Sequence, residues 1–357
     1  MRLLLHTEAS PGWGGQEIRI LAEAQEFRSR GWRVLLACQP KSRILLEAQE
    51  TGIPSFPVCM RGALDALAFF HLRQLMKDEG VSLVHTHSSV DSWLATTAAK
   101  TLGLPVVRSR HVSIPVKRRR ARVYHLADRV ITSGEEIKRI LVGAGLSAEK
   151  IVTVPAGVDV ERFSPEVSGD HVRKEFGLEG PVVGMVAMFR SSKGHRVFLE
   201  AAGEIRGARP NARFLIVGDG VGRSDIEGEI RRLGLEEVVT LTGFRRDIPE
   251  VIAAMDCLVL PALRSEGTPQ VIPQALALGK PVVASAVGGI PEVIQDKETG
   301  ILVLPGDGDA LARAIVSVLD DPKWAQTMAL RGRERVLARF SFARQIEDTE
   351  KVYRELV

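Results

Sequence analysis

The sequence predicts an α/β protein with two doubly wound, Rossmann-like domains, each built on a parallel sheet covered by helices on both faces. The chain has 357 residues, more than a single hydrophobic core usually serves. Short runs rich in Val, Ile and Leu alternate with helix-like segments along its length, which is typical of parallel sheets buried on both faces. The alternation pauses once, at the Pro- and Gly-containing stretch 155–166, and then restarts. We interpret that stretch as the linker.

The first series of alternating segments predicts a domain over residues 1–165. It opens with the strand-like RLLLH, a glycine-rich turn and QEIRILAEAQEFRSRG, whose apolar spacing and terminal Gly are helical. Further predicted strands are RVLLAC, SLVHTHS, PVVRSRH, DRVITSG and KIVTVP.

The second series predicts a domain over residues 166–339. Its strands are PVVGMVAMF, ARFLIVGDG, VVTLTG, DCLVLPA, PVVASAVGG and GILVLP. The remaining segment, 340–357, is amphipathic and isolated, and we expect it to form a helix that returns to the first domain.

Composition excludes several classes of protein. No run of about 18 apolar residues occurs, so we expect no membrane-spanning segment, and MRLLLH is too short for a signal peptide. Cys38, Cys59 and Cys257 form no CxxC pair, and we interpret them as buried thiols of a protein in a reducing compartment. We therefore expect a cytoplasmic protein.

The basic residues are concentrated in the first half. Residues 1–165 hold 23 Lys and Arg against 16 Asp and Glu, whereas residues 166–357 hold 25 against 28. Part of the surplus is the run KRRRAR, which begins with Lys117, Arg118, Arg119 and Arg120. The run is either a solvated face or a site for anionic lipid head groups or a phosphate-bearing acceptor. The lipid alternative predicts peripheral binding to the inner face of a membrane. Nucleic acid is not expected, because no aromatic residues interleave the run.

The carboxyl ends of the predicted strands carry the candidate ligand groups, because open α/β sheets bind ligands there. Gly14 and Gly15 follow the first strand and let the backbone approach an anion. Arg190 and Lys193 leave the first strand of the second domain just before a helix. Two cations beside a helix N-terminus suit a diphosphate.

Three histidines also lie at predicted strand ends. His111 ends PVVRSRH, where it could donate to a substrate hydroxyl. His85 and His87 form a His-x-His pair in SLVHTHS, which raises the alternative of zinc. In a strand these two side chains point the same way, and SLVHTHS itself holds no Cys or carboxylate as a third ligand. We therefore expect no metal site.

The stretch RSEGTPQVIPQALALGKPVVAS places an acid before a helix. Glu266 precedes it, and Gln274 lies inside it. Thr268 is expected to cap this helix and Pro269 to occupy its first position, where no N–H is required.

Five features of the sequence form a combined pattern: GGQE, the strand-end His, R..KGH, VTLTGFRRDIPEVIAAMDCLVLPA and SEGTPQVIPQALALGKPVVAS...GGIPEVI...TGILV. This pattern resembles glycosyltransferase family 4. The resemblance covers nearly the whole chain and is densest over residues 181–305. It implies the GT-B fold, a nucleoside-diphosphate sugar as donor and transfer with retention of configuration.

The resemblance also implies roles for single residues. By it, Glu266 contacts the hydroxyls of the donor sugar, and Gln274 stands where the family has a second Glu that holds the ribose. Because Gln can both accept and donate hydrogen bonds, we expect altered ribose contact rather than a dead site. The backbone expected to contact the diphosphate comprises Gly267, Thr268, Gln270 and Val271.

Other residues match the family pattern less evenly. Lys193 matches directly, His111 matches the N-domain histidine near the donor sugar, and Gly15 matches the glycine turn facing the diphosphate. Arg190 lies two positions after the place of the family's phosphate-binding Arg, which is Met188 here. No Asp-x-Asp motif is evident, so we expect neither metal nor cofactor.

The function expected from these features is a hexosyltransferase that acts in cell-surface glycan or lipopolysaccharide synthesis on a glycan or lipid-linked acceptor. Two alternatives stay open. A non-catalytic relative would bind glycans or nucleotides, with Gln274 as a sign of decay. An oxidoreductase or epimerase would need a GxGxxG turn, and GDGVG at Gly218–Gly222 lacks that spacing.

Overall fold

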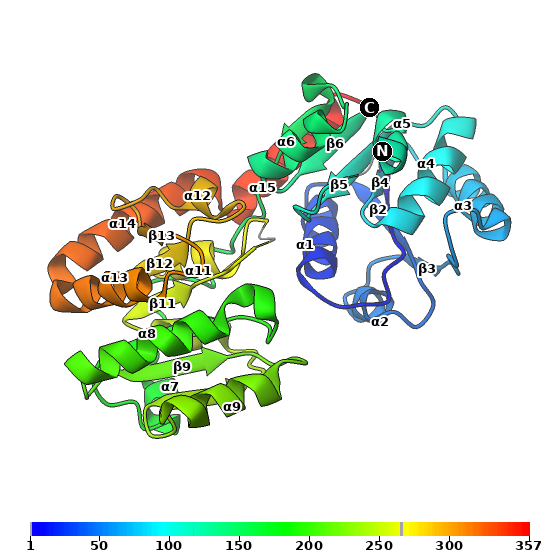
Figure 1. Ribbon diagram of the computed structural model, residues 1–357. Helices are drawn as coiled ribbons and strands as arrows, with labels where there is room; N and C mark the ends of the chain where they lie inside the picture. The colour runs from blue at the N-terminus through cyan, green and yellow to red at the C-terminus, as the bar shows by residue number, and fades with distance from the viewer. Residues whose placement is uncertain (1, 117, 265–266) are drawn as a thin grey trace. The chain divides into compact units, whose positions relative to one another are not determined.

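The structure is a computed structural model that describes residues 2–116, 118–264 and 267–357 (Figure 1). The chain forms two compact units. Unit 1 comprises Met1–Ala156 and Gln345–Val357, and unit 2 comprises Gly157–Arg344.

The described residues of unit 1 form a seven-stranded parallel sheet in the order β3-β2-β1-β4-β5-β6-β7. Its strands are β1 Leu3–Glu8, β2 Arg33–Cys38, β3 Ser55–Pro57, β4 Leu83–Thr86, β5 Val106–Arg110, β6 Arg129–Thr132 and β7 Ile151–Thr153. Its helices are α1 Gly15–Ser29, α2 Arg43–Glu50, α3 Ala66–Glu79, α4 Ser89–Thr101, α5 Arg118–Leu126, α6 Glu135–Gly143, the 3-10 turn η1 Ala148–Lys150 and most of α15 Phe342–Arg354.

The strand order of unit 1 reverses between β1 and β4. From β1 the chain first moves outward to β2 and β3, and then returns to β4 and continues to β7. Right-handed crossovers therefore place α1 and α2 on one face of the sheet and α3, α4 and α5 on the other. On that second face α3 packs on α4 and α4 packs on α5. The crevice at such a reversal is where open α/β sheets bind ligands.

The described residues of unit 2 form a six-stranded parallel sheet in the order β10-β9-β8-β11-β12-β13. Its strands are β8 Val182–Val186, β9 Arg213–Val217, β10 Val239–Gly243, β11 Cys257–Leu260, β12 Val282–Ser285 and β13 Ile301–Val303. Its helices are α7 Asp170–Glu175, η2 Ser191–Lys193, α8 His195–Ala208, α9 Arg223–Leu233, α10 Ile248–Ala253, α11 Val271–Ala277, α12 Ile290–Val293, α13 Gly308–Asp320 and α14 Pro322–Arg339. Here the order reverses between β8 and β11.

Each predicted strand is present, and the predicted α/β class with two Rossmann-like folds is confirmed. The short strand β3 was missed. The stretch 155–166 is not a free linker, because Val158 and Phe163 are buried in the core of unit 2. Val158 also pairs with Ser341.

The C-terminal helix α15 packs on unit 1, as predicted. Tyr353 is fully buried, its ring centroid lies 5.0 Å from that of Phe27, and its hydroxyl lies 2.6 Å from Nδ1 of His85. Gln345 Nε2 donates to Glu23 in α1 at 2.7 Å. The last helix thus completes a core whose other elements lie near the start of the chain.

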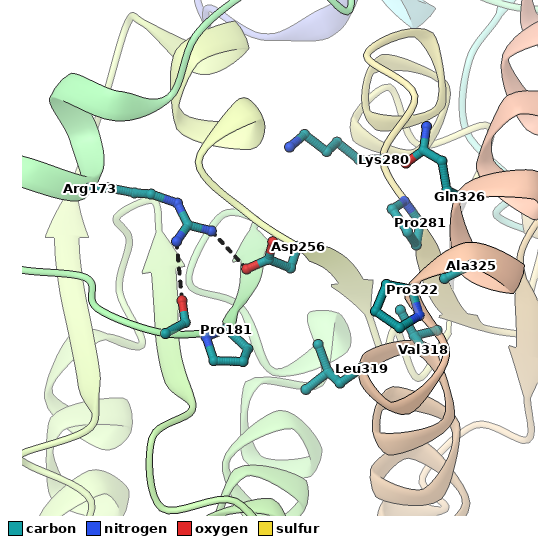
Figure 2. Close-up of a pocket in the computed structure, with 11 residues that line it drawn as sticks. Arg173, Pro181, Asp256, Lys280, Pro281, Val318, Leu319, Pro322, Ala325 and Gln326 are labelled. Carbon is teal, nitrogen blue, oxygen red and sulfur yellow. Dashed lines mark hydrogen bonds and ion pairs between the residues drawn. The ribbon is translucent and has the colours of Figure 1, made fainter.

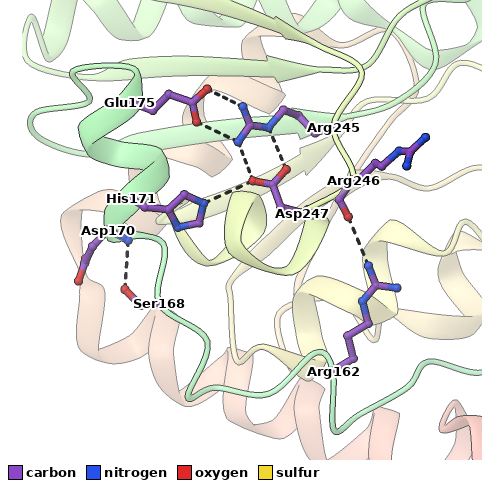
Figure 3. A network of polar contacts seen from close by, with 8 residues as sticks. All are labelled: Arg162, Ser168, Asp170, His171, Glu175, Arg245, Arg246 and Asp247. Carbon is purple, nitrogen blue, oxygen red and sulfur yellow. Dashed lines mark hydrogen bonds and ion pairs between the residues drawn. The ribbon is translucent and has the colours of Figure 1, made fainter.

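In unit 2, Arg245 ties α7 to the turn between β10 and α10 (Figure 3). Its guanidinium donates to both oxygens of Glu175, at 2.6 and 2.9 Å, and to both oxygens of Asp247, at 2.9 and 2.6 Å. These bonds lower the pKa of Asp247 to about 2. His171 Nε2 lies 3.4 Å from the same carboxylate. The turn after β10 is therefore held by paired charges at the carboxyl end of the sheet.

Acid should destabilise unit 1 through its buried histidines. Burial lowers the pKa of His6 to about 3, from 6.5. Between these values the unfolded chain binds more protons, so the free energy of unfolding falls as the pH falls. At pH 4.5 His6 alone should cost about 2–3 kcal/mol.

Urea unfolding between pH 7 and pH 4.5 measures this effect. His6→Asn should show a shallower decline than the wild type, whereas His71→Asn, at an exposed position on α3, should keep the wild-type decline. Equal declines in the wild type and His6→Asn would contradict the assignment.

Candidate active site

The reversal point of unit 2 is bordered by the turn that follows β8. Arg190 is exposed there and precedes the 3-10 turn η2, whose last residue is Lys193. Gly194 then adopts φ +78° and leads into α8. A Cβ at Gly194 would overlap the carbonyl oxygen of Pro261. The sequence-predicted cations Arg190 and Lys193 therefore lie on a turn that packs directly against the exit of β11.

The turn after β11 forms the other border of the reversal point. Leu263 N donates to Ser192 O at 2.8 Å, which joins the two turns. Gly267 packs against the turn after β12, since a Cβ on Gly289 would lie 2.5 Å from its carbonyl oxygen. The turns that follow β8, β11 and β12 therefore meet at one edge of the sheet. Glu266, the predicted sugar contact, lies outside the described residues.

The start of α11 differs from the prediction. The helix begins at Val271, and its N-cap is Gln270, which makes no side-chain cap bond among the described residues. Thr268 is thus not the cap, and Pro269 is not the first helical residue. Of the predicted diphosphate-binding backbone, residues 267–270 form a turn that leads into the helix, and Val271 is the first helical residue. Gln274 is half-buried inside α11, and its N–H donates to Gln270 O at 3.1 Å.

The glycines of GDGVG are explained by packing. Gly218 and Gly220 both adopt positive φ, and a Cβ on Gly218 would overlap Ala187 O. Phe189 N donates to Asp219 O at 3.0 Å, and Gly222 N donates to Phe189 O at 3.1 Å. The turn at Gly218–Gly222 therefore packs against the residues that follow β8.

Two pockets of unit 2 differ in their relation to this edge. Arg190, Gly194 and Leu263 help to line one of about 280 Å³. A second pocket lies at the opposite, amino ends of the strands (Figure 2). Its cations already have partners, because Arg173 donates to Asp256 at 2.7 Å and Lys280 donates to Ala253 O, the last residue of α10, at 2.6 Å. We assign the second pocket a structural role.

In unit 1 the glycine turn lies at the reversal between β1 and β4. Gly14 is the N-cap of α1, and Gly15 is its first residue. No side chain of the described residues caps this helix. An uncapped helix start preceded by a glycine turn leaves backbone N–H groups for an anion.

The predicted strand-end histidines have different environments. His111 follows β5, is partly exposed and stacks on His87, with ring centroids 6.2 Å apart and planes 10° apart. Burial and the nearby charges of Arg19 and Arg108 lower the pKa of His111 to about 3. His111 is therefore neutral near pH 7. His85 is fully engaged in the core, where its Nε2 lies 2.8 Å from Ser109 Oγ.

His6 joins His85 and His87 in a buried cluster that sequence reasoning missed. One ring nitrogen of each lies within 4.8 Å of the others. However, His6 Nδ1 and His87 Nε2 bond each other at 2.9 Å, and both nitrogens of His85 bond Tyr353 and Ser109. The outer nitrogens of His6 and His87 have no hydrogen-bond partner among the described residues, whereas metal-bound histidines are normally oriented by one. We interpret the cluster as packing.

Sequence reasoning also missed an acidic pair at this edge, Glu8 and Asp91, and an arginine pair beside it. Arg108 and Arg110 donate to the hydroxyl of Tyr124 at 3.1 and 2.7 Å. The available signal was position, since Glu8 ends the first strand directly before the glycine turn.

The basic run falls at the start of α5. Lys117 lies outside the described residues, and only the backbone of Arg118, Arg119 and Arg120 is described, as the first residues of this helix. Further along this helix, Ala121 and Tyr124 are buried. Within the described ranges, no helix combines the length and apolar character needed to cross a bilayer.

Family models match both halves of the chain. Residues 13–162 match Glycosyltransferase Family 4, and residues 180–321 match Glycosyl transferases group 1. The Escherichia coli UDP-Gal:alpha-D-GlcNAc-diphosphoundecaprenol alpha-1,3-galactosyltransferase is 28% identical over 99% of this chain and 97% of that protein. The alpha-D-kanosaminyltransferase of Streptomyces kanamyceticus is 27% identical over 95% of this chain and 98% of that protein.

Solved structures show the same fold. The Anabaena protein Alr3699/HepE, crystallised with UDP, is 24% identical with a TM-score of 0.90, and all of both chains is covered. A glycosyltransferase from Rickettsia africae is 20% identical with a TM-score of 0.92 over 99% of this chain and 98% of that one. The two parallel sheets thus form a GT-B fold. The chain belongs to glycosyltransferase family 4.

Proposed function

We propose that the protein transfers a hexosyl group from a nucleoside-diphosphate sugar to a hydroxyl of a glycan or lipid-linked acceptor, with retention of configuration, in cell-surface glycan or lipopolysaccharide synthesis. The observation that carries the proposal is the meeting of three turns, after β8, β11 and β12, at the strand reversal of unit 2. Arg190 and Lys193 on the first turn supply the positive charge that a diphosphate requires.

The relatives support this choice of substrates. The E. coli relative is named for UDP-Gal and for an acceptor linked to diphosphoundecaprenol. The Anabaena protein has been solved with UDP-glucose. By analogy we propose that unit 2 holds the nucleotide sugar and that unit 1 serves the acceptor.

Within this proposal the donor residues act as follows. Arg190, Lys193 and the backbone of 267–271 stabilise the diphosphate as its negative charge grows. Glu266 orients the sugar hydroxyls, and Gln274 contacts the ribose. Gly14 and Gly15 are also proposed to contact the diphosphate.

The chemistry requires no protein nucleophile. The acceptor oxygen forms a bond to the anomeric carbon on the face that the diphosphate leaves, and the acceptor proton passes to the departing phosphate oxygen. His111, neutral near pH 7, donates a hydrogen bond to the donor sugar. Exclusion of water from the site limits hydrolysis. The proposal includes neither metal nor cofactor.

We also propose that unit 1 docks on an anionic membrane at the inner face of the bilayer. Three large apolar side chains are exposed at the start of α3 and just before it. They are Leu64, Leu67 and Phe70, which are 98%, 79% and 63% exposed. In a parallel sheet α3 and α5 begin at the same, carboxyl edge, and they lie on one face of it. The apolar start of α3 and the basic start of α5 together suit an anionic lipid surface.

A panel of nucleotide sugars with a lipid-diphosphate acceptor tests the transfer reaction. We expect one donor to give a product whose anomeric configuration, measured by NMR, equals that of the donor. Glu266→Ala should abolish transfer while leaving nucleoside-diphosphate binding intact. Glu237→Ala, whose side chain is 88% exposed, is the matched control. Inversion would refute the mechanism, and donor binding without transfer would favour the non-catalytic relative.

Gln274→Glu tests the ribose contact. A charged acceptor should tighten binding of the nucleoside diphosphate by about fivefold, the gain expected for a charge-assisted bond. Calorimetric titration measures it. Gln326→Glu, which makes the same change beside the pocket in Figure 2, should leave affinity unchanged. A large loss of affinity in Gln274→Glu would show that the assignment is wrong.

Vesicle sedimentation tests membrane docking. The wild type should pellet with vesicles that contain anionic lipid and stay in solution with neutral ones. Replacing Leu64, Leu67 and Phe70 by Ser, or the four basic residues from Lys117 to Arg120 by Gln, should each weaken pelleting about tenfold or more. Replacing Leu330 and Leu337 on α14, which are 48% and 38% exposed, is the control. Equal pelleting of all variants would mean that the apolar start of α3 and the basic run are solvated surfaces that do not bind membranes.

A further inference from the structure

Two carboxylic acids are buried together at the strand reversal of unit 1. Glu8 is the last residue of β1, and Asp91 lies in the first turn of α4, directly after β4. Both side chains are fully buried. Neither is used in the chemistry proposed above, and two adjacent buried acids cannot both ionise without strong repulsion.

Asp91 has the donors that a carboxylate needs. Thr7 Oγ1 donates to it at 2.8 Å, and the backbone N–H groups of His87 and Ser88 donate at 2.9 and 2.8 Å. The hydroxyl of Ser88 donates to it as well. Arg108 adds a favourable charge. The single negative charge of the pair is therefore best placed on Asp91, although burial raises its pKa.

Glu8 instead holds the glycine turn. Its Oε1 accepts from Ser10 N at 2.7 Å, and its Oε2 accepts from Gln16 Nε2 at 2.5 Å. Ser10 Oγ in turn accepts from Gly12 N at 3.0 Å. One carboxyl group thus fixes both ends of the segment 10–16, which includes the turn at Gly14 and Gly15.

The burial of the pair favours a neutral Glu8. Ser88 Oγ accepts from Ala9 N at 3.3 Å and donates its one proton to Asp91. Ionising Glu8 as well would place two like charges side by side in a buried site. Consistently, burial and the charge of Asp91 raise the pKa of Glu8 to about 8.

We propose that Glu8 is a positioning residue, held as a neutral acid, that fixes the glycine turn for the donor diphosphate. The inference rests on the proposed function for the identity of the ligand alone. Ionisation of Glu8 would place a second negative charge beside a turn that must accept an anion. Donor binding should therefore weaken at alkaline pH.

The groups around Glu8 allow this titration to be isolated. Asp91 faces it from α4, and Cys38 faces it from β2, with a thiol pKa raised to about 12 by burial. His6 on β1 and His87 after β4 have lowered pKa values and stay neutral above pH 7. Two residues in the first turn of α1 complete the surroundings of Glu8. Gln16 has no titratable group, and Glu17 is the one acidic residue of that turn. Burial raises the pKa of Glu8 to about 8, and the Glu8→Gln variant separates its titration from that of Asp91.

The test compares Glu8→Gln, which stays neutral at every pH, with Glu8→Ala, which removes the anchor. For the wild type, kcat/KM for the donor should fall up to tenfold per pH unit above about 8. Glu8→Gln should lack this fall. Glu8→Ala should raise the donor KM about tenfold at all pH values. Glu26→Gln, elsewhere on α1, should keep the wild-type profile.

Two measurements decide the proposal without turnover. Infrared difference spectra between the wild type and Glu8→Gln should show a protonated carboxyl band at pH 6.5 that disappears as the pH rises through about 8. Amide hydrogen exchange at Ser10 and Gly12 should accelerate in Glu8→Ala and stay slow in Glu8→Gln at pH 7. Absence of the carboxyl band, or equal exchange in Glu8→Ala and the wild type, would overturn the proposal. If these signatures are present but no nucleotide sugar is turned over, the failure lies in the proposed function.

Discussion

The arrangement of unit 2 depends on the contact between Gly194 and the carbonyl oxygen of Pro261. The two residues belong to turns that leave β8 and β11, the strands between which the sheet reverses its order. A side chain of even one carbon at position 194 would separate these turns, and the positive φ of Gly194 would strain any residue with a side chain. Because this contact brings the turns together, Arg190, Lys193 and the backbone of Gly267 lie at one edge. The positive charge and the backbone N–H groups of the proposed donor site follow from it.

Most of the fold could be predicted from sequence because its signals are local. The alternation of apolar strands and amphipathic helices is visible within short windows, and the glycine turns mark where strands end. The start of α11 was predicted wrongly for a physical reason. Thr268 and Pro269 form a good local helix start, but Gly267 packs against Gly289 and the chain enters the helix only at Val271. A tertiary contact overrode a correct local preference.

The polar interior of unit 1 shows what sequence reasoning could not reach. The bond from Thr7 to Asp91 joins residues separated by 84 positions, and the one from His6 to His87 spans 81. Nothing in either segment alone indicates that acids and histidines will be buried against one another. Their pairing follows from the adjacency of β1 and β4, with His6 in register with His85. The individual site residues on strand ends could be named beforehand, but the network that supports them could not.

The return of α15 to unit 1 has a consequence for biogenesis. Residues 157–344 interrupt unit 1 in the chain, so a ribosome synthesises all of unit 2 before it adds Tyr353. Until then, the ring faces of Phe27 and Trp32 lack one partner, and Nδ1 of His85 lacks its hydroxyl. The sheet of unit 1 is therefore synthesised early but lacks its last helix until the whole of unit 2 has been made. During that interval it is the part of the nascent protein most exposed to chaperones and to aggregation.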